Sequence, residues 1–241
     1  MDERAFTFYH SRFTIHEPMR PLSLKRLARE FMFSAAEITL VLLAWWDVRG
    51  FFASGARAGL IAILLIVPFI TYWSESERGN RGLRPVKGQA RTLVLLEVGF
   101  FVAFLVVPFC DRHGVLVFAE STILRYAGLA LFATGVALRA WAFVYLGKFF
   151  SVFLTIQEGH RLVTGNIYRF VRHPSYTGLL VRSLGWALVF RSLVGLLAWL
   201  VLLGFLVGRM NHEERVLESE FGAEWEAYQR RTPRRLVPGI Y

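Results

Sequence analysis

The chain has 241 residues, of which 55% are hydrophobic, and it carries a formal net charge of +10. The apolar residues form long stretches that a soluble domain would not need, and the basic residues are spread over alternate segments between these stretches, which argues against a nucleic-acid-binding protein. The single cysteine, Cys110, excludes an internal disulfide and a cysteine-rich metal site.

Residues 1–30 are predicted to form a cytosolic N-terminal segment that is retained in the protein. They hold six basic residues and lack the short apolar core and small-residue cleavage site of a signal peptide. Ser23 is suited to cap a short basic helix over residues 24–30. We expect this helix to lead into the first membrane span along an anionic membrane surface.

Four apolar segments meet or approach the roughly 20 residues that a membrane-spanning helix requires. These segments cover residues 31–47, 58–73, 92–109 and 122–146. Backbone amides in lipid must be satisfied within their own segment, and the chain lacks the alternating pattern of a membrane β-barrel. We therefore expect four transmembrane helices within residues 31–146.

A further apolar tract, residues 177–207, is too long for one ordinary span. Arg191 and Ser192 interrupt it, which indicates a hairpin of two helices. The predicted fold class is therefore all-α, a polytopic membrane bundle of about six transmembrane helices that ends in a helical hairpin. Residues 147–241 are expected to hold the catalytic loop, this hairpin and a C-terminal cytosolic segment, in one domain with the first four helices.

The distribution of basic residues predicts the orientation in the membrane. With the N-terminus inside the cell, the segments expected to be cytosolic hold 21 of the 28 Lys and Arg residues, as the positive-inside rule requires. These segments are residues 1–30, 74–91, 147–176 and 208–241. We expect an integral membrane protein with both termini in the cytosol.

Four charged residues lie within or near the expected spans, where charge is costly unless it is paired or functional. Of these, Glu97 and Arg139 are the candidates for a buried ion pair, and Glu37 and Arg182 lie within reach of helix ends.

Two polar clusters are predicted to meet at the cytosolic ends of the hairpin helices. The first cluster covers residues 157–164 and 168–178. In it, Pro174 excludes His173 from the α region and is suited to begin a helix. The second, residues 211–215, follows the second hairpin helix where it leaves the membrane on the same side. Their carboxylate, basic and aromatic side chains suit a cofactor that carries a sulfonium, an ammonium and a carboxylate.

Adjacent helical residues point about 100° apart, so only one of Glu213 and Glu214 can face the interior squarely. We expect this residue to be Glu214, because Arg209 is available to pair with Glu213 one turn earlier. Taken alone, these residues also fit a structural interpretation, with His173 as an interfacial cap and Tyr176 as an interfacial aromatic. No metal site is expected, because His212 and Glu213 point to different helix faces.

The motifs around these clusters resemble those of the isoprenylcysteine carboxyl methyltransferases and their phospholipid-methylating relatives. The resemblance covers about residues 155–240 and has two parts. They are His160-x-Leu162-Val163-Thr164 with Tyr168 and Arg172-His173-Pro174-Ser175-Tyr176-x-Gly178, and Glu213-Glu214 with Phe221-Gly222-x-Glu224-Trp225-x-x-Tyr228 and Pro233.

This resemblance implies an S-adenosylmethionine-dependent membrane methyltransferase that acts on a lipophilic or prenylated acceptor, with a carboxylate as the expected methyl acceptor. Arg172 and Glu214 are the implied catalytic residues: Arg172 would orient an acidic substrate or the cofactor carboxylate, and His160 or Glu214 could help an amine acceptor lose its proton. The residues implied to bind the cofactor are His160, His173, Tyr176, Gly178, Glu213 and Glu214.

An NADPH-dependent membrane sterol reductase is the alternative enzyme, because such reductases resemble this chain in the Arg-His-Pro-x-Tyr-x-Gly core. They typically have Asn before the Tyr and an acidic residue after the Gly, whereas this chain has Ser175 and Leu179 there. A non-catalytic membrane protein is the second alternative, since a shared fold does not establish turnover.

Overall fold

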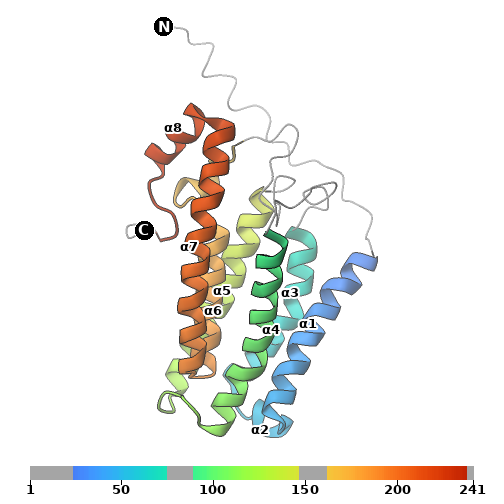
Figure 1. Cartoon of the computed structure of the whole chain (residues 1–241). Coiled ribbons are helices and arrows are strands. Elements are labelled where there is room, and N and C mark those ends of the chain that lie inside the picture. The colour runs from blue at the N-terminus through green and yellow to red at the C-terminus, as the bar shows by residue number, and fades with distance from the viewer. Residues whose placement is uncertain (1–23, 75–88, 147–161, 238–241) are drawn as a thin grey trace.

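The computed structural model describes residues 24–74, 89–146 and 162–237, and these residues form an all-helical bundle (Figure 1). An isolated bridge between Val117 and Ser192 is the one β-type contact within them. The elements in chain order are α1 (Leu24–Trp45), α2 (Val48–Phe52), α3 (Gly55–Ser74), α4 (Gln89–His113), α5 (Thr122–Leu146), the 3-10 helix η5 (Asn166–Arg169), α6 (Pro174–Val189), α7 (Leu193–Phe221) and α8 (Ala223–Arg231).

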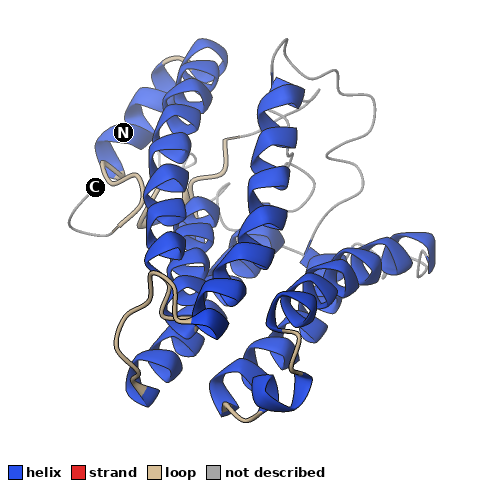
Figure 2. Ribbon diagram, turned by 60° about the horizontal axis from the view of Figure 1, so that its bottom comes forward, coloured by secondary structure: helices blue, strands red, loops and turns tan. Residues whose placement is uncertain are grey.

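The long helices confirm the predicted fold class. Four of the described helices, α3, α4, α5 and α7, are long and apolar enough to cross a membrane. α1 and α6 run beside them, and α6 has only 16 residues, so a count of six spans is approximate. In the bundle α1 packs on α3 and α4, α3 also packs on α5, and α6 packs on α5 and α7. Figure 2 shows the same helices from a second direction.

The helix boundaries differ from the prediction mainly at the beginning of the bundle. The basic residues 24–30 are not a separate helix, because α1 runs unbroken from Leu24 to Trp45. α1 ends where Trp46 adopts a positive φ of 63°. Asp47 then caps the short helix α2, which was not predicted, by accepting a hydrogen bond from the backbone amide of Gly50 at 3.0 Å.

The predicted hairpin is confirmed, and it turns at the predicted residues. α6 ends at Val189 and α7 begins at Leu193. Between them Arg191 has a positive φ of 49°, and the side chain of Ser192 caps α7 by accepting from the amide of Gly195 at 3.0 Å.

α5 and α6 meet along a seam of glycines. Gly128 and Gly135 on α5 face Gly185 and Gly178 on α6. A Cβ added at Gly178 would lie 2.8 Å from the carbonyl oxygen of Gly135, and one at Gly128 would lie 2.8 Å from that of Gly185. Larger residues at these positions would therefore force the two helices apart. Small residues at the contact allow such close approach in other membrane helix pairs too.

The charged residues within the helices pair differently from the expectation. Glu97 of α4 is exposed, so it does not form a buried pair with Arg139. Arg139 instead donates to the carbonyl of Ser175 at 3.3 Å. Arg182 of α6 interacts electrostatically with Glu37 of α1.

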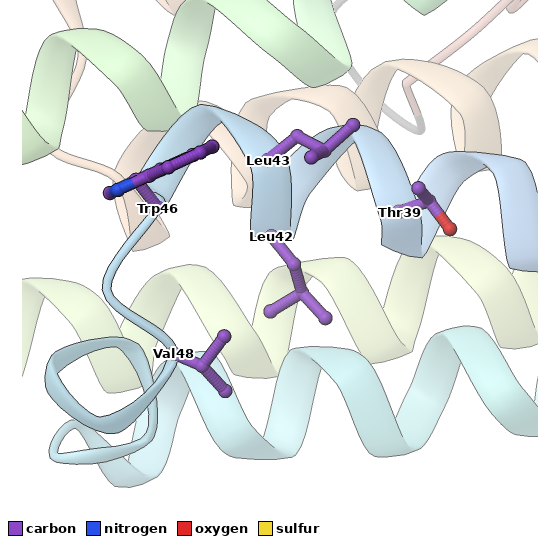
Figure 3. A pocket seen from close by; sticks show the side chains of 5 residues that line it. All are labelled: Thr39, Leu42, Leu43, Trp46 and Val48. Atoms are coloured by element: carbon purple, nitrogen blue, oxygen red, sulfur yellow. The ribbon is translucent and has the colours of Figure 1, made fainter.

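A shallow apolar groove of about 320 Å³ lies at the C-terminal end of α1, beside α2 (Figure 3). It is lined by Thr39, Leu42, Leu43, Trp46 and Val48. None of these five side chains has a titratable group.

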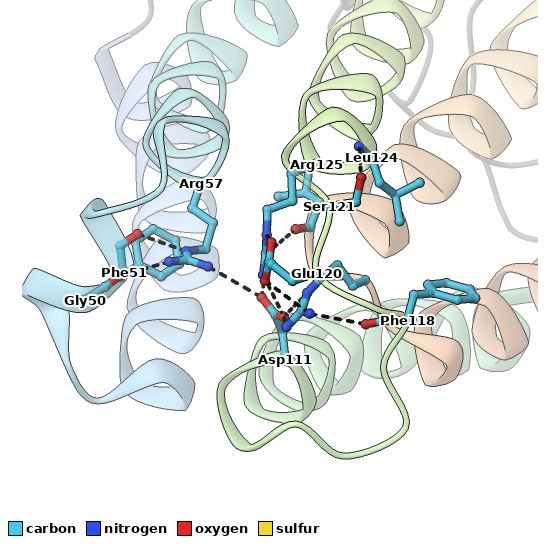
Figure 4. A network of polar contacts seen from close by, with 11 residues as sticks. Gly50, Phe51, Arg57, Asp111, Phe118, Glu120, Ser121, Leu124 and Arg125 are labelled. Carbon is cyan, nitrogen blue, oxygen red and sulfur yellow. Dashed lines mark hydrogen bonds and ion pairs between the residues drawn. The ribbon is translucent and has the colours of Figure 1, made fainter.

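The lower end of the bundle in Figure 1 is fastened by a buried carboxylate, Asp111 of α4 (Figure 4). Arg125 of α5 donates to both of its oxygens, at 2.8 and 3.0 Å. Arg191 of the hairpin turn donates to Asp111 Oδ1 at 2.6 Å from its Nη2, and Arg57 of α3 lies 3.6 Å from Oδ2. Four elements are therefore joined through one side chain, which lies outside the predicted site.

Two further contacts extend this cluster toward its surroundings. The guanidinium of Arg57 donates to the carbonyls of Phe51 and Gly50, both at 2.9 Å, and so holds α2 against α3. The hydrogen bond from Arg125 lowers the pKa of Glu120 to about 2, so this carboxylate stays ionised beside the arginines.

Candidate functional site

The candidate site lies at the opposite end of the bundle, where α6 begins and α7 approaches α8 (Figure 1). α6 begins at Pro174, and His173 stands at the N-cap with φ −124° and ψ 60°. The ring of Pro174 keeps His173 out of the helical region and has no amide hydrogen that the first helical turn would leave unpaired. The predicted start of this helix is therefore confirmed.

Glu214 of α7 is the centre of the cluster. Its side chain is 6% exposed, and three basic side chains converge on it. Arg235 donates to its Oε2 at 2.7 Å, His173 Nε2 lies 3.0 Å from its Oε1, and Arg172 Nε lies 3.2 Å from the same oxygen. A carboxylate only accepts hydrogen bonds, so Nε2 is the donor of the His173 ring. The three contacts compensate the cost of burying this charge.

Tyr176 links the beginning of α6 to the other carboxylate, Glu213. Its hydroxyl donates to Glu213 Oε2 at 2.7 Å and accepts from Arg209 Nε at 2.8 Å. The hydroxyl therefore lies between the two residues that were expected to pair directly. The ring of Tyr176 stacks on His173, with centroids 5.5 Å apart and planes 10° apart. Tyr176 is therefore stacked on His173 and hydrogen-bonded to Glu213.

Residues 232–236, which we call the C-terminal strap, hold the approach to α6 in place. The amides of Arg172 and His173 donate to the carbonyls of Arg234 and Arg235, each at 3.0 Å. One turn into α6, Thr177 Oγ1 donates to the carbonyl of Leu236 at 2.6 Å. These bonds fix the backbone of His173 relative to the strap.

α8 supports the same loop from the other side. Tyr228, which is buried, donates its hydroxyl to the carbonyl of Tyr168 in η5 at 2.7 Å. Burial raises the pKa of both phenols above their usual range, so each keeps its proton. Tyr228 of the C-terminal motif therefore has a structural function here.

The structure brings together five of the predicted site residues. They are Arg172, His173, Tyr176, Glu213 and Glu214. Gly178 lies near them in α6, but its Cα faces α5, so close helix packing already accounts for a glycine there. His160 lies outside the described residues.

The two adjacent glutamates differ in burial as expected. The Glu213 side chain is 30% exposed and that of Glu214 is 6% exposed. Arg235 was missed as a site residue, because in the sequence it reads as one of several basic residues of a cytosolic C-terminus. The one signal that could have found it is its place beside the C-terminal motif.

The model of the Isoprenylcysteine carboxyl methyltransferase (ICMT) family matches residues 128–219. This segment contains α6 and nearly all of α7, and therefore the glycine seam and both glutamates. Arg235 and the strap lie outside it.

Several curated proteins with similar sequences are named as methyltransferases. The chain is 33% identical over 109 residues to "Protein-S-isoprenylcysteine O-methyltransferase B" of Arabidopsis thaliana, which covers 44% of this chain and 55% of that protein. It is 35% identical over 115 residues to the Schizosaccharomyces pombe "Protein-S-isoprenylcysteine O-methyltransferase", covering 46% and 49%. A Delta(14)-sterol reductase of Mus musculus is 34% identical over 86 residues, which cover 34% of this chain and 20% of the reductase.

A solved structure has a similar fold. It is described as the eukaryotic intramembrane Ras methyltransferase ICMT, and it matches with a TM-score of 0.58 and 20% identity over 89% of this chain and 77% of that one. The sequence matches span about half the length of the curated methyltransferases. Residues 128–219 are therefore similar to the isoprenylcysteine carboxyl methyltransferase family.

Proposed function

We propose that this protein transfers a methyl group from S-adenosylmethionine to the carboxylate of a prenylated acceptor. The observation that carries the proposal is the contact between two motifs 41 residues apart, His173 at the start of α6 and Glu214 in α7, inside the segment that matches the family. The family match supports the reaction class, and the polar cluster supports its location.

The side chains of the cluster fit the chemical groups of the proposed cofactor. Glu213 is partly exposed and suits an ammonium group, while the stacked faces of His173 and Tyr176 suit a sulfonium. S-adenosylmethionine supplies an electrophilic methyl group when bound. Glu214 is enclosed by basic side chains. We therefore propose that it holds Arg172 and His173 in position and does not contact the ammonium directly.

The proposed reaction needs orientation more than acid–base chemistry. A carboxylate oxygen of the acceptor forms the new bond to carbon, and the electron pair of the broken bond remains on sulfur, so no proton is released. The protein must hold the three reacting atoms in line and exclude water. We assign the orientation of the acceptor carboxylate to Arg172, which is 8% exposed and lies beside Glu214.

We further propose that the site faces the cytosol. The beginning of α1 and the end of α7 lie at the same end of the bundle as the cluster (Figure 1). The four segments that the sequence predicts to be cytosolic hold 21 of the 28 basic residues, which supports a cytosolic orientation. Both termini would then also be cytosolic.

The similarity to the Delta(14)-sterol reductase keeps an NADPH-dependent reductase as the second candidate. Purified protein in detergent can separate the two by binding of labelled S-adenosylmethionine and of NADPH. We expect the first to bind and to raise the thermal midpoint, because a ligand of the folded state alone stabilises it. Methyl transfer to N-acetyl-S-farnesylcysteine completes the test. Binding of NADPH alone would replace the proposed function with the reductase, and binding of neither would favour a non-catalytic protein.

A further inference from the structure

The C-terminal strap contributes one side chain to the cluster, that of Arg235. We propose that Arg235 binds the carboxylate of a ligand in this site, and that Glu214 and Asn211 hold its guanidinium ready for that carboxylate. The inference rests on the proposed function for the identity of the ligands, since both the acceptor and S-adenosylmethionine carry a carboxylate.

Exposure distinguishes Arg235 from the other residues around Glu214. Its side chain is 26% exposed, compared with 8% for Arg172 and 4% for His173. A ligand arriving from outside the cluster therefore meets Arg235 before it meets the more deeply buried groups.

The charges of the cluster favour an anionic ligand. Two carboxylates, Glu213 and Glu214, lie among three arginines. Arg172 and Arg235 contact Glu214 directly, and Arg209 contacts Tyr176, which is bonded to Glu213. These three arginines and two glutamates carry one more positive than negative charge. A bound carboxylate balances this excess.

The guanidinium of Arg235 is also held in a defined orientation. Its Nη2 donates to Glu214 Oε2 at 2.7 Å, and its Nη1 donates to Asn211 Oδ1 at 2.9 Å. Asn211 and Glu214 are three residues apart on α7 and so share one helix face. A planar group fixed in this way loses little conformational freedom when it binds a carboxylate through parallel hydrogen bonds.

The backbone brings this side chain to the start of α6. The carbonyl of Arg235 accepts the amide of His173 at 3.0 Å, so the two residues are neighbours across the strap. Arg234, the preceding residue, is exposed and uses its carbonyl to accept the amide of Arg172. Arg234→Gln therefore removes the same charge from the same segment and serves as the matched control for Arg235→Gln.

The experiment measures the preference for a carboxylate in each of the two ligands. For the acceptor, it compares the binding of N-acetyl-S-farnesylcysteine with that of its carboxamide; for the cofactor, it compares S-adenosylmethionine with its decarboxylated form. Both comparisons use the full chain in detergent and the variants R235Q, R235K and R234Q. The thermal midpoint of each variant reports its folding.

We expect R235Q to lower one of these preferences about 10-fold or more, which is the effect of one charge-assisted hydrogen bond, and R234Q to leave both unchanged. Loss of the acceptor preference assigns Arg235 to the acceptor, and loss of the cofactor preference assigns it to the cofactor. R235K, which keeps the charge but not the planar fork, should lie between the parent and R235Q.

Unchanged preferences in a folded R235Q would overturn the proposal, and if R235Q does not fold, unchanged preferences in R235K would do the same. The proposed function has a separate outcome. If the parent neither binds S-adenosylmethionine nor transfers methyl groups, yet prefers the acceptor carboxylate through Arg235, only the proposed function fails. Normal methyl transfer with unchanged preferences in every variant would remove only the assignment of Arg235.

Discussion

Replacing Glu214 with glutamine should destabilise the protein strongly, because two buried or half-buried arginines depend on its charge. The carboxylate accepts from Arg235 at 2.7 Å and lies 3.2 Å from Arg172 Nε, and its side chain is only 6% exposed. Breaking a buried ion pair from one side costs about 3 to 5 kcal/mol. Glutamine keeps one oxygen acceptor, so we expect a loss near the lower value, about 3 kcal/mol.

Thermal unfolding measures this loss directly. For a chain of this size, about 3 kcal/mol corresponds to a fall of roughly 6 to 12 °C in the thermal midpoint. Glu218→Gln, at an exposed position one turn further along α7, should leave the midpoint within about 1 °C, since substitutions at such surface sites change stability little. Glu213→Gln should have a small effect on stability and a larger one on the binding of S-adenosylmethionine. If the thermal midpoint of Glu214→Gln equals that of Glu218→Gln, this account of the cluster is refuted.

Other parts of the molecule allow three further predictions. Asp111→Ala should destabilise the folded protein by about 3 to 5 kcal/mol in thermal unfolding, because it leaves buried arginines without their shared carboxylate; an unchanged midpoint would contradict the assigned role. Gly178→Val should prevent α5 and α6 from packing, which a loss of monodisperse protein in size-exclusion chromatography would reveal. In a cysteine-free background, cysteines at Asn80 and Arg235 should be labelled from the cytosolic side and one at His113 from the other side; labelling of the first two from different sides would reject the orientation.

The elements that could be predicted from the sequence are those encoded by local pattern. Thr122–Leu146 forms a helix over the predicted range because its apolar run has clear ends. The hairpin turns at Arg191 and Ser192 because a charged residue and a capping residue interrupt one apolar tract. Pro174 marks the start of α6 through its fixed φ and missing amide hydrogen.

Features that depend on contacts between distant residues could not be predicted in this way. Asp111 lies beside Arg191 only after the bundle has formed, and their 80 positions of separation give no pattern to read. Arg235 reaches Glu214 because the strap pairs with the residues before α6, which the charge of the C-terminus does not indicate. Gly178 was assigned to the cofactor by resemblance, whereas its place in the seam depends on the register of α5 against α6.

The glycine seam also restricts how a hydrophobic ligand can reach the cluster. Gly135 and Gly178 let the two backbones touch, so the interface between α5 and α6 leaves no width for an acyl or isoprenoid chain. α6 begins at the cluster and packs closely on α5 along these glycines. The site is therefore closed to a ligand between these two helices. A ligand embedded in the membrane therefore has to arrive by a path that avoids the α5–α6 boundary.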